Sequence, residues 1–140
     1  MNYKILSLAV ASSLALTLIP ASAEGKKMDP SKLPAASSKK GVTYEADIKT
    51  VFEKSCVKCH SGEKAKGKLH LDSLVGAIKG GKEGPDIIAG KSGESPLVYA
   101  VAHVGDEDDF MPPPDNKAKI GPLTKEQVGL IRAWIDQGAK

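Results

Sequence analysis

The sequence predicts a small all-α domain with long irregular loops, and three observations support this fold class. Four segments carry apolar residues at helical spacing, no segment shows the alternation typical of a β-strand, and glycine and proline gather between the segments. The chain has 140 residues, which is enough for one small domain and not for two.

The first 23 residues have the pattern of a secretory signal peptide. Lys4 is a positive start, residues 5–19 are apolar apart from Ser and Thr, and Ala21–Ala23 supply the small side chains that a signal peptidase requires. A retained membrane anchor is the alternative, but the apolar run is short for a bilayer span. We therefore expect cleavage after Ala23 and a periplasmic protein with no membrane span.

Residues 24–42 are rich in Lys, Pro, Ser and Ala and lack apolar periodicity, so they are predicted to be a flexible basic linker before a domain at 43–140. The linker either attracts an anionic surface or is a solvated tether. Without residues 1–23 the chain keeps 19 of its 20 Lys and Arg residues against 17 Asp and Glu. This near balance argues against nucleic acid as a partner.

The first predicted helix leads directly to the chain's two cysteines. Thr43 is a suitable N-cap, and Ile48, Val51 and Phe52 recur at helical spacing up to Cys56. A loop is expected at 61–68, and Asp72 or Ser73 caps a brief helix that runs through residue 78.

A long glycine-rich loop at 80–93 precedes the third predicted helix. Ser95 and Pro96 combine a capping hydroxyl with proline at the first helical position, and this helix is expected to end near His103. A second long loop follows at 105–122. Loops of this length usually have a function or wrap a ligand.

The last predicted helix has the clearest boundaries in the chain. Thr124 and Gln127 match a capping box, and Gly138 ends the helix. Between them lies a broad apolar face, made of Val128, Leu130, Ile131, Trp134 and Ile135.

Cys56, Cys59 and His60 form the spacing of a c-type haem attachment motif. Two thiols at this spacing bond to the two vinyl groups of one porphyrin, and the adjacent histidine is then placed to bind the iron axially. The chain has no other cysteine and only two Phe, one Trp and three Tyr. A covalently held haem c would use both thiols and fill an otherwise thin core.

Three other chemistries compete for the same motif. A structural zinc site requires further ligands, and the sequence has no second cysteine pair. A thioredoxin-like redox pair requires a βαβ setting, which the pattern of segments does not predict. A local disulfide explains neither His60 nor the shortage of aromatic residues.

The sixth iron ligand has three candidates in the sequence. Met111 lies in the second long loop before three prolines, which stiffen the backbone around it. Methionine also fills gaps in cores, and His103, at a helix end, is favoured there as a cation. His70 lies between two leucines. We predict Met111 as the ligand, with His103 and then His70 as the alternatives.

From residue 42 to 139 the chain resembles a monohaem class I cytochrome c, and in particular the short cytochrome c domains of planctomycetes. The segments that carry the resemblance are Cys56–His60, Lys68–Asp72, Gly80–Gly90, Met111–Pro113 and Leu130–Ala139. The resemblance implies a fold in which the first and last helices cross beside the haem, with His–Met ligation by His60 and Met111. It also implies that Pro85 or a neighbouring carbonyl orients His60, and it suggests a contact of His70 with a haem propionate.

We therefore predict a periplasmic electron carrier of a respiratory chain rather than an enzyme. It would exchange single electrons with redox protein partners, either free or docked to a larger respiratory complex. The alternative is a haem domain with a displaceable sixth ligand, acting as a small peroxidase or a ligand sensor. Only His103 is a plausible acid–base residue for the peroxidase.

An acidic run at Asp106–Asp109 precedes Met111. If this loop lies at the exposed haem edge, its charge would steer a basic partner toward the haem. A solvated loop without a binding role is the alternative.

Overall fold

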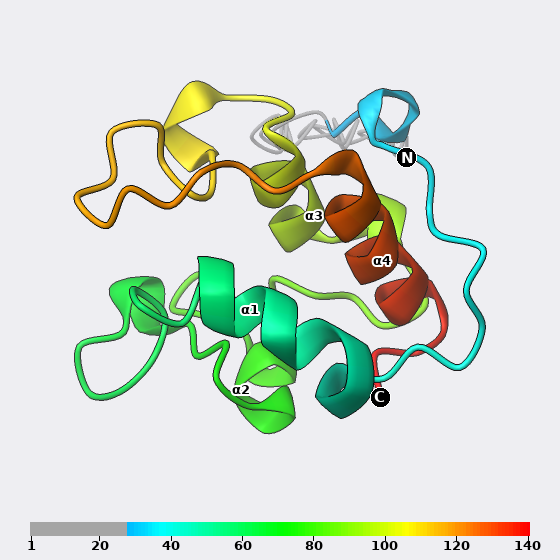
Figure 1. The fold of residues 1–140 in the computed structure, drawn as a ribbon, viewed down its shortest axis with the longest axis horizontal. Helices are drawn as coiled ribbons and strands as arrows, with labels where there is room; N and C mark the ends of the chain where they lie inside the picture. The colour runs from blue at the N-terminus through cyan, green and yellow to red at the C-terminus, as the bar shows by residue number, and fades with distance from the viewer. Residues whose placement is uncertain (1–27) are drawn as a thin grey trace, which may run out of the picture.

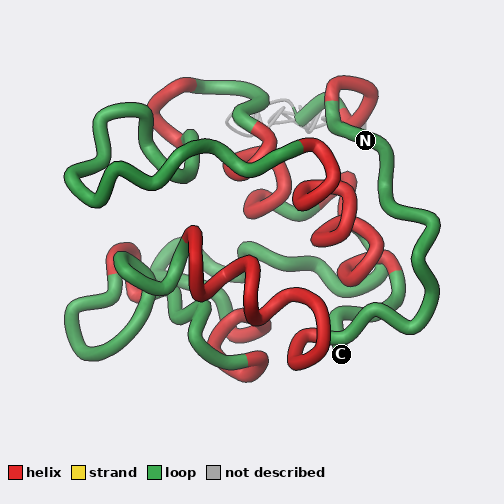
Figure 2. Tube along the Cα trace, in the orientation of Figure 1, coloured by secondary structure: helices red, strands yellow, loops and turns green. Residues whose placement is uncertain are grey.

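The computed structural model describes residues 28–140, and their helices lie in two groups (Figure 1). Helices α1 (Lys49–Ser55) and α2 (Leu74–Lys79) form one group, and α3 (Pro96–Ala102) and α4 (Lys125–Asp136) form the other. Helices and loops account for the whole described part, with no strand (Figure 2). The predicted all-α class is confirmed for these residues.

Shorter helical segments complete the described chain. A π-helical turn at Tyr44–Ile48 leads into α1, and four 3₁₀ turns lie at Pro30–Lys32, Lys66–Lys68, Ser92–Glu94 and Glu107–Asp109. The predicted signal peptide at 1–23 lies outside the described residues. Within those residues, none of the helices combines the length and the apolar character that crossing a bilayer requires.

Local sequence signals account for most helix boundaries. The Thr43 hydroxyl accepts a hydrogen bond from the Ala46 amide at 3.3 Å, and the Ser73 hydroxyl accepts one from Gly76 at 3.1 Å. At α4, the predicted capping box between Thr124 and Gln127 is present in both directions. These caps satisfy amide groups that have no partner inside the helix.

The start of α3 was predicted correctly, but the cap was not. The Ser95 hydroxyl donates to the Lys91 carbonyl at 2.9 Å and accepts from the Ile88 amide at 2.9 Å. It therefore ties the preceding loop together, and it makes no capping bond to α3. Pro96 at the first helical position needs no donor partner, so the helix starts without the hydroxyl.

Three aromatic rings join the two groups of helices. Trp134 of α4 lies with its ring centroid 6.1 Å from that of Phe52 and 6.0 Å from that of Tyr44, and the Phe52 and Trp134 rings meet edge to face. All three side chains are buried. Edge-to-face packing of large rings adds to the stability that their buried area provides. Side chains of the first and last helices are thus in contact.

Part of the predicted linker at 24–42 makes contacts with α4 in the structure. The backbone amide of Ser37 donates to the Gly129 carbonyl at 2.9 Å, and the Arg132 guanidinium donates to the Pro34 carbonyl. Leu33 is buried in the core. Residues 33–42 therefore pack along α4, because α4 offers hydrogen-bond partners that lie far away in the sequence.

We predict that Arg132→Ala lowers the free energy of unfolding by about 1–3 kcal/mol, the range for a lost charge-assisted hydrogen bond. Arg132 also donates to the Ser92 hydroxyl at 3.1 Å, so the substitution removes two ties at once. Denaturant titration of the holoprotein measures the change. Lys125→Ala, at an exposed position of the same helix, is the control. Equal stability of the two variants would contradict the stabilising role of the Arg132 hydrogen bonds.

Candidate haem site

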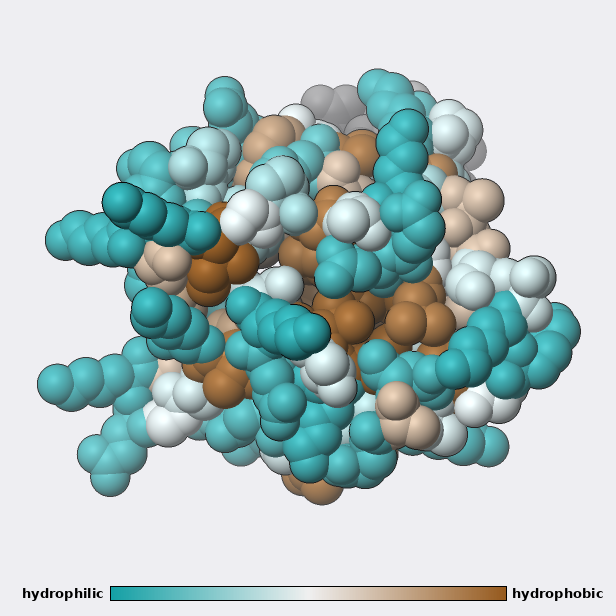
Figure 3. All heavy atoms as spheres, in the orientation of Figure 1, coloured by the Kyte–Doolittle hydropathy of each residue, from teal (hydrophilic) through white to brown (hydrophobic). Residues whose placement is uncertain are grey.

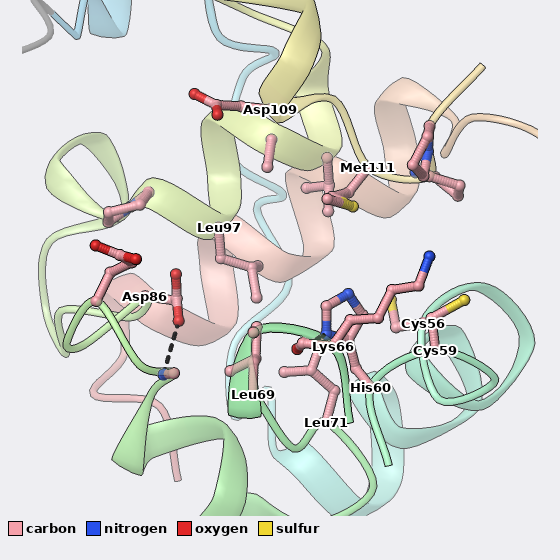
Figure 4. Close-up of a pocket in the computed structure, with 18 of the residues that line it drawn as sticks. Cys56, Cys59, His60, Lys66, Leu69, Leu71, Asp86, Leu97, Asp109 and Met111 are labelled. Carbon is pink, nitrogen blue, oxygen red and sulfur yellow. Dashed lines mark hydrogen bonds between the residues drawn. The ribbon is translucent and has the colours of Figure 1, made fainter. Parts of the chain in front are cut away.

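A cavity of about 440 Å³ lies between the two groups of helices. Leu69 and Leu71 line one wall, and Leu97 of α3 lines the other (Figure 4). In the space-filling view, apolar residues gather in the hollow between the two halves, and hydrophilic side chains surround it (Figure 3). A mostly apolar cavity of this size is typical of a ligand or cofactor site.

The predicted attachment residues lie together on one wall of this cavity. Cys56, Cys59 and His60 all line it. The amide groups of Cys59 and His60 both donate to the Cys56 carbonyl at 3.0 Å, so the chain keeps turning after α1 ends. This turn places both thiols and the imidazole beside the same space (Figure 4).

A short cycle of hydrogen bonds orients the His60 ring. His60 Nδ1 lies 3.1 Å from the Lys66 carbonyl oxygen, and the Lys66 amide donates to the Cys59 carbonyl at 2.9 Å. A carbonyl only accepts, so the proton is on Nδ1. Nε2 then keeps its lone pair for a metal, as in other histidine ligands held by a carbonyl. The orienting carbonyl belongs to Lys66, and not to the Pro85 loop as the resemblance implied.

The loop at 80–86 contacts the residues of this hydrogen-bond cycle. The Lys82 amide donates to the Gly67 carbonyl at 2.8 Å, and the Gly81 amide donates to the Asp86 carboxylate at 3.0 Å. A Cβ atom on Gly81 would lie 2.7 Å from the Gly67 carbonyl oxygen, closer than atoms pack. Glycine at 81 therefore lets the two loops approach each other, next to the carbonyl that orients His60.

Burial shifts the pKa of the Cys56 thiol and of the His60 imidazole. It raises the pKa of the Cys56 thiol to about 12, with a further contribution from Cys59, and it lowers the pKa of His60 despite hydrogen bonds to the Lys66 and Leu69 carbonyls. A raised thiol pKa opposes the thiolate that a reactive redox pair requires. A lowered imidazole pKa favours the neutral ring, which is the form that binds a metal.

Met111 enters the cavity from the wall opposite His60 (Figure 4). Its amide donates to the Ala100 carbonyl at 3.0 Å, which fixes the loop to the end of α3. The other two ligand candidates, His103 and His70, do not line the cavity. The structure therefore brings Met111 together with Cys56, Cys59 and His60.

These residues fit haem c. The cavity has two thiols at the attachment spacing, an imidazole with a free Nε2, a thioether across from it and apolar walls. The competing chemistries find less support in the described residues. No group of three or more His, Cys, Asp and Glu there is arranged to hold a metal ion, and no strand there provides a βαβ setting for a redox pair.

Comparison with known families agrees with this geometry. The family model described as Planctomycete cytochrome C matches residues 56–115, from Cys56 through the Met111 loop. Residues 56–115 of this chain are therefore similar to a planctomycete-type cytochrome c domain. The family implies haem c as the cofactor. No curated protein and no solved structure matches the chain.

Sequence reasoning did not find two residues of the site, Lys66 and Asp86. Lys66 acts through its backbone carbonyl, which every residue has, so its identity carries no signal. Asp86 is half-buried at the cavity, where burial raises the pKa of its carboxyl group. Its position just after Gly84 and Pro85 in a long loop was the only available indication.

We predict that Gly81→Ala displaces the loop around Gly67 and disturbs the orientation of His60. The expected results are a free energy of unfolding lower by about 1–3 kcal/mol, as for an overpacked site, and a changed midpoint potential of the haem. Denaturant titration and a spectroelectrochemical titration measure them. Gly121→Ala is the matched control, since its Cβ would meet nothing within 4 Å. Identical behaviour of the two variants would contradict this role of Gly81.

Proposed function

We propose that this protein is an exported cytochrome with one haem c, which transfers single electrons between redox protein partners. The observation that carries the proposal is the placement of His60 and Met111 on opposite walls of one apolar cavity. Two protein ligands at these places would occupy both axial positions. That arrangement favours electron transfer over the binding of an external ligand.

Each residue of the cavity has a specific part in this function. Haem c, when bound, supplies the one-electron centre. Cys56 and Cys59 would hold it covalently, and His60 and Met111 would be its axial ligands. A bound Met111 thioether would favour the reduced state, and the apolar walls would disfavour the additional charge of the oxidised state, so both would raise the potential.

A peroxidase or a ligand sensor finds less support. A peroxidase requires an acid–base side chain at the open face of the iron, and His103 was the candidate from the sequence. In the structure His103 lies outside the cavity lining, behind the loop that carries Met111.

The location and the partners also belong to this proposal. The signal-peptide pattern at 1–23 supports export to the periplasm. Redox proteins of a respiratory chain, either free or within a larger complex, are the partners that a periplasmic carrier of this kind would meet.

We predict that Met111→Ala abolishes the near-infrared sulfur-to-iron band of the ferric holoprotein. The midpoint potential should fall by an appreciable part of the about 0.8 V range that axial ligands span, because the thioether no longer favours reduced iron. The reduced variant, unlike the wild type, should bind carbon monoxide. His70→Asn is the control and should keep the band. A wild type without the band, or one that binds carbon monoxide readily, would favour the alternative functions.

The mouth of the cavity carries charges of both signs. Asp108 and Asp109 line it together with Lys66 and Lys82. The predicted condition for steering, that the acidic loop lies at the cavity, thus has structural support. We propose that this mouth is where redox partners dock, and that the acidic side favours basic partners.

We predict that Asp108→Asn with Asp109→Asn changes the reaction with small charged reagents in opposite directions. At low ionic strength, reduction by hexaammineruthenium(II), a cation, should slow about two- to fivefold, and oxidation by ferricyanide, an anion, should speed up by a similar factor. Stopped-flow rates measure both. At about 0.5 M salt the differences should vanish, because the Debye length becomes shorter than the approach distance. Lys82→Gln is the control of opposite sign. Rates that do not respond to either change would remove the steering role.

A further inference from the structure

His103 has an unusual environment for a histidine. Among residues 28–140, its Nε2 is the buried side-chain polar atom that has no hydrogen-bond partner. Its backbone is left-handed, with φ of 52° and ψ of 47°. A buried polar atom without a partner lowers stability, so a histidine at this position calls for a compensating role.

The ring of His103 stacks on the ring of Phe110. The ring centroids are 4.6 Å apart, and the planes differ by only 10°. Phe110 precedes Met111 directly, so the stack lies at the base of the segment that carries the thioether. Stacked aromatic pairs add stability beyond the area that they bury, so the contact stabilises this position of the segment.

The backbone couples the same residues a second time. The Ala100 carbonyl at the end of α3 accepts hydrogen bonds from the His103 amide at 3.2 Å and from the Met111 amide at 3.0 Å. The left-handed conformation of His103 turns the chain out of α3, and histidine adopts this conformation more readily than most residues. His103 therefore ends the helix and places its ring against the returning loop.

The stack identifies which property of His103 matters. The imidazole contributes its flat face to the contact with Phe110, and its Nε2 adds no hydrogen bond. A polar role would need a partner for that atom. The geometry instead favours a packing role, in which the imidazole ring stacks on the Phe110 ring.

We propose that the His103–Phe110 stack is a positioning device that holds Met111 in the cavity. This inference rests on the proposed ligation by Met111. His103 and Phe110 act through the Met111 loop, so loss of the stack would loosen the thioether without removing it. The ferric protein should then bind an external ligand more tightly, since the ligand competes with Met111 for the same position.

Binding of imidazole to the ferric holoprotein, followed by loss of the near-infrared band, tests this proposal. His103→Asn keeps a residue suited to left-handed backbone but removes the ring, and Phe110→Leu keeps apolar volume but removes the stack. We expect each variant to bind imidazole about two- to tenfold more tightly than wild type, the factor that an aromatic pair contributes. Their double variant should add little to either change, because both remove the same contact.

Two control variants distinguish the stacked ring from a general loss of stability. His103→Phe keeps a flat ring and should bind imidazole within about twofold of wild type. His70→Asn removes a histidine outside the cavity lining and should match wild type. The free energy of unfolding of each variant is measured in parallel. Tighter imidazole binding is attributed to loss of the stack only where the gain in affinity exceeds the gain that the lower global stability would cause.

Three results would overturn the proposal. They are unchanged imidazole binding in both His103→Asn and Phe110→Leu, fully additive effects in the double variant, or a His103→Phe variant that behaves like His103→Asn. Failure of the underlying function looks different. In that case the wild type itself lacks the near-infrared band, and Met111→Ala leaves its spectrum unchanged.

Discussion

The packing of Trp134 against Phe52 and Tyr44 is the contact on which the rest of this molecule depends. It joins the first helix to the last, and so it helps to fix the two halves to each other. The cavity lies between these halves, and exposed charged residues line part of it. Few large aromatic residues are needed, because they are concentrated at this one junction while a cofactor-sized space takes the place of further core.

A second constraint acts on the side of the cavity formed with α1 and α2, around His60. Its ring is held by the Lys66 carbonyl, whose own residue is held by Cys59, and the next carbonyl in the chain is held by Lys82. The orientation of the His60 ring is thus set by backbone groups of two loops and not by a side chain. Such an arrangement tolerates variation in side chains, but it depends on the close approach that Gly81 permits.

The sequence was sufficient for features that depend on neighbouring residues. The caps at Thr43, Ser73 and Thr124 and the Cys56–His60 spacing are local patterns, and the structure places them as expected. Features that depend on distant partners were missed or wrong. The segment at 33–42 finds its partner Arg132 across 98 residues, and the carbonyl that orients His60 could have come from any loop near the ring. Composition describes what such a segment is made of, but not which surface it meets.

Met111 was predicted from three prolines beside it, yet the structure indicates a different support. A thioether is a weak metal ligand. If its segment had to be ordered on binding, the loss of conformational entropy would offset the energy of the bond, so the segment should already be ordered. Two features supply that order from α3: the shared Ala100 carbonyl and the ring of His103 stacked on Phe110. On this view His103, which the sequence suggested as a rival of Met111 for the iron, serves the same site from behind. Under the proposed ligation, His103 would hold Met111 in place and would not compete with it for the iron.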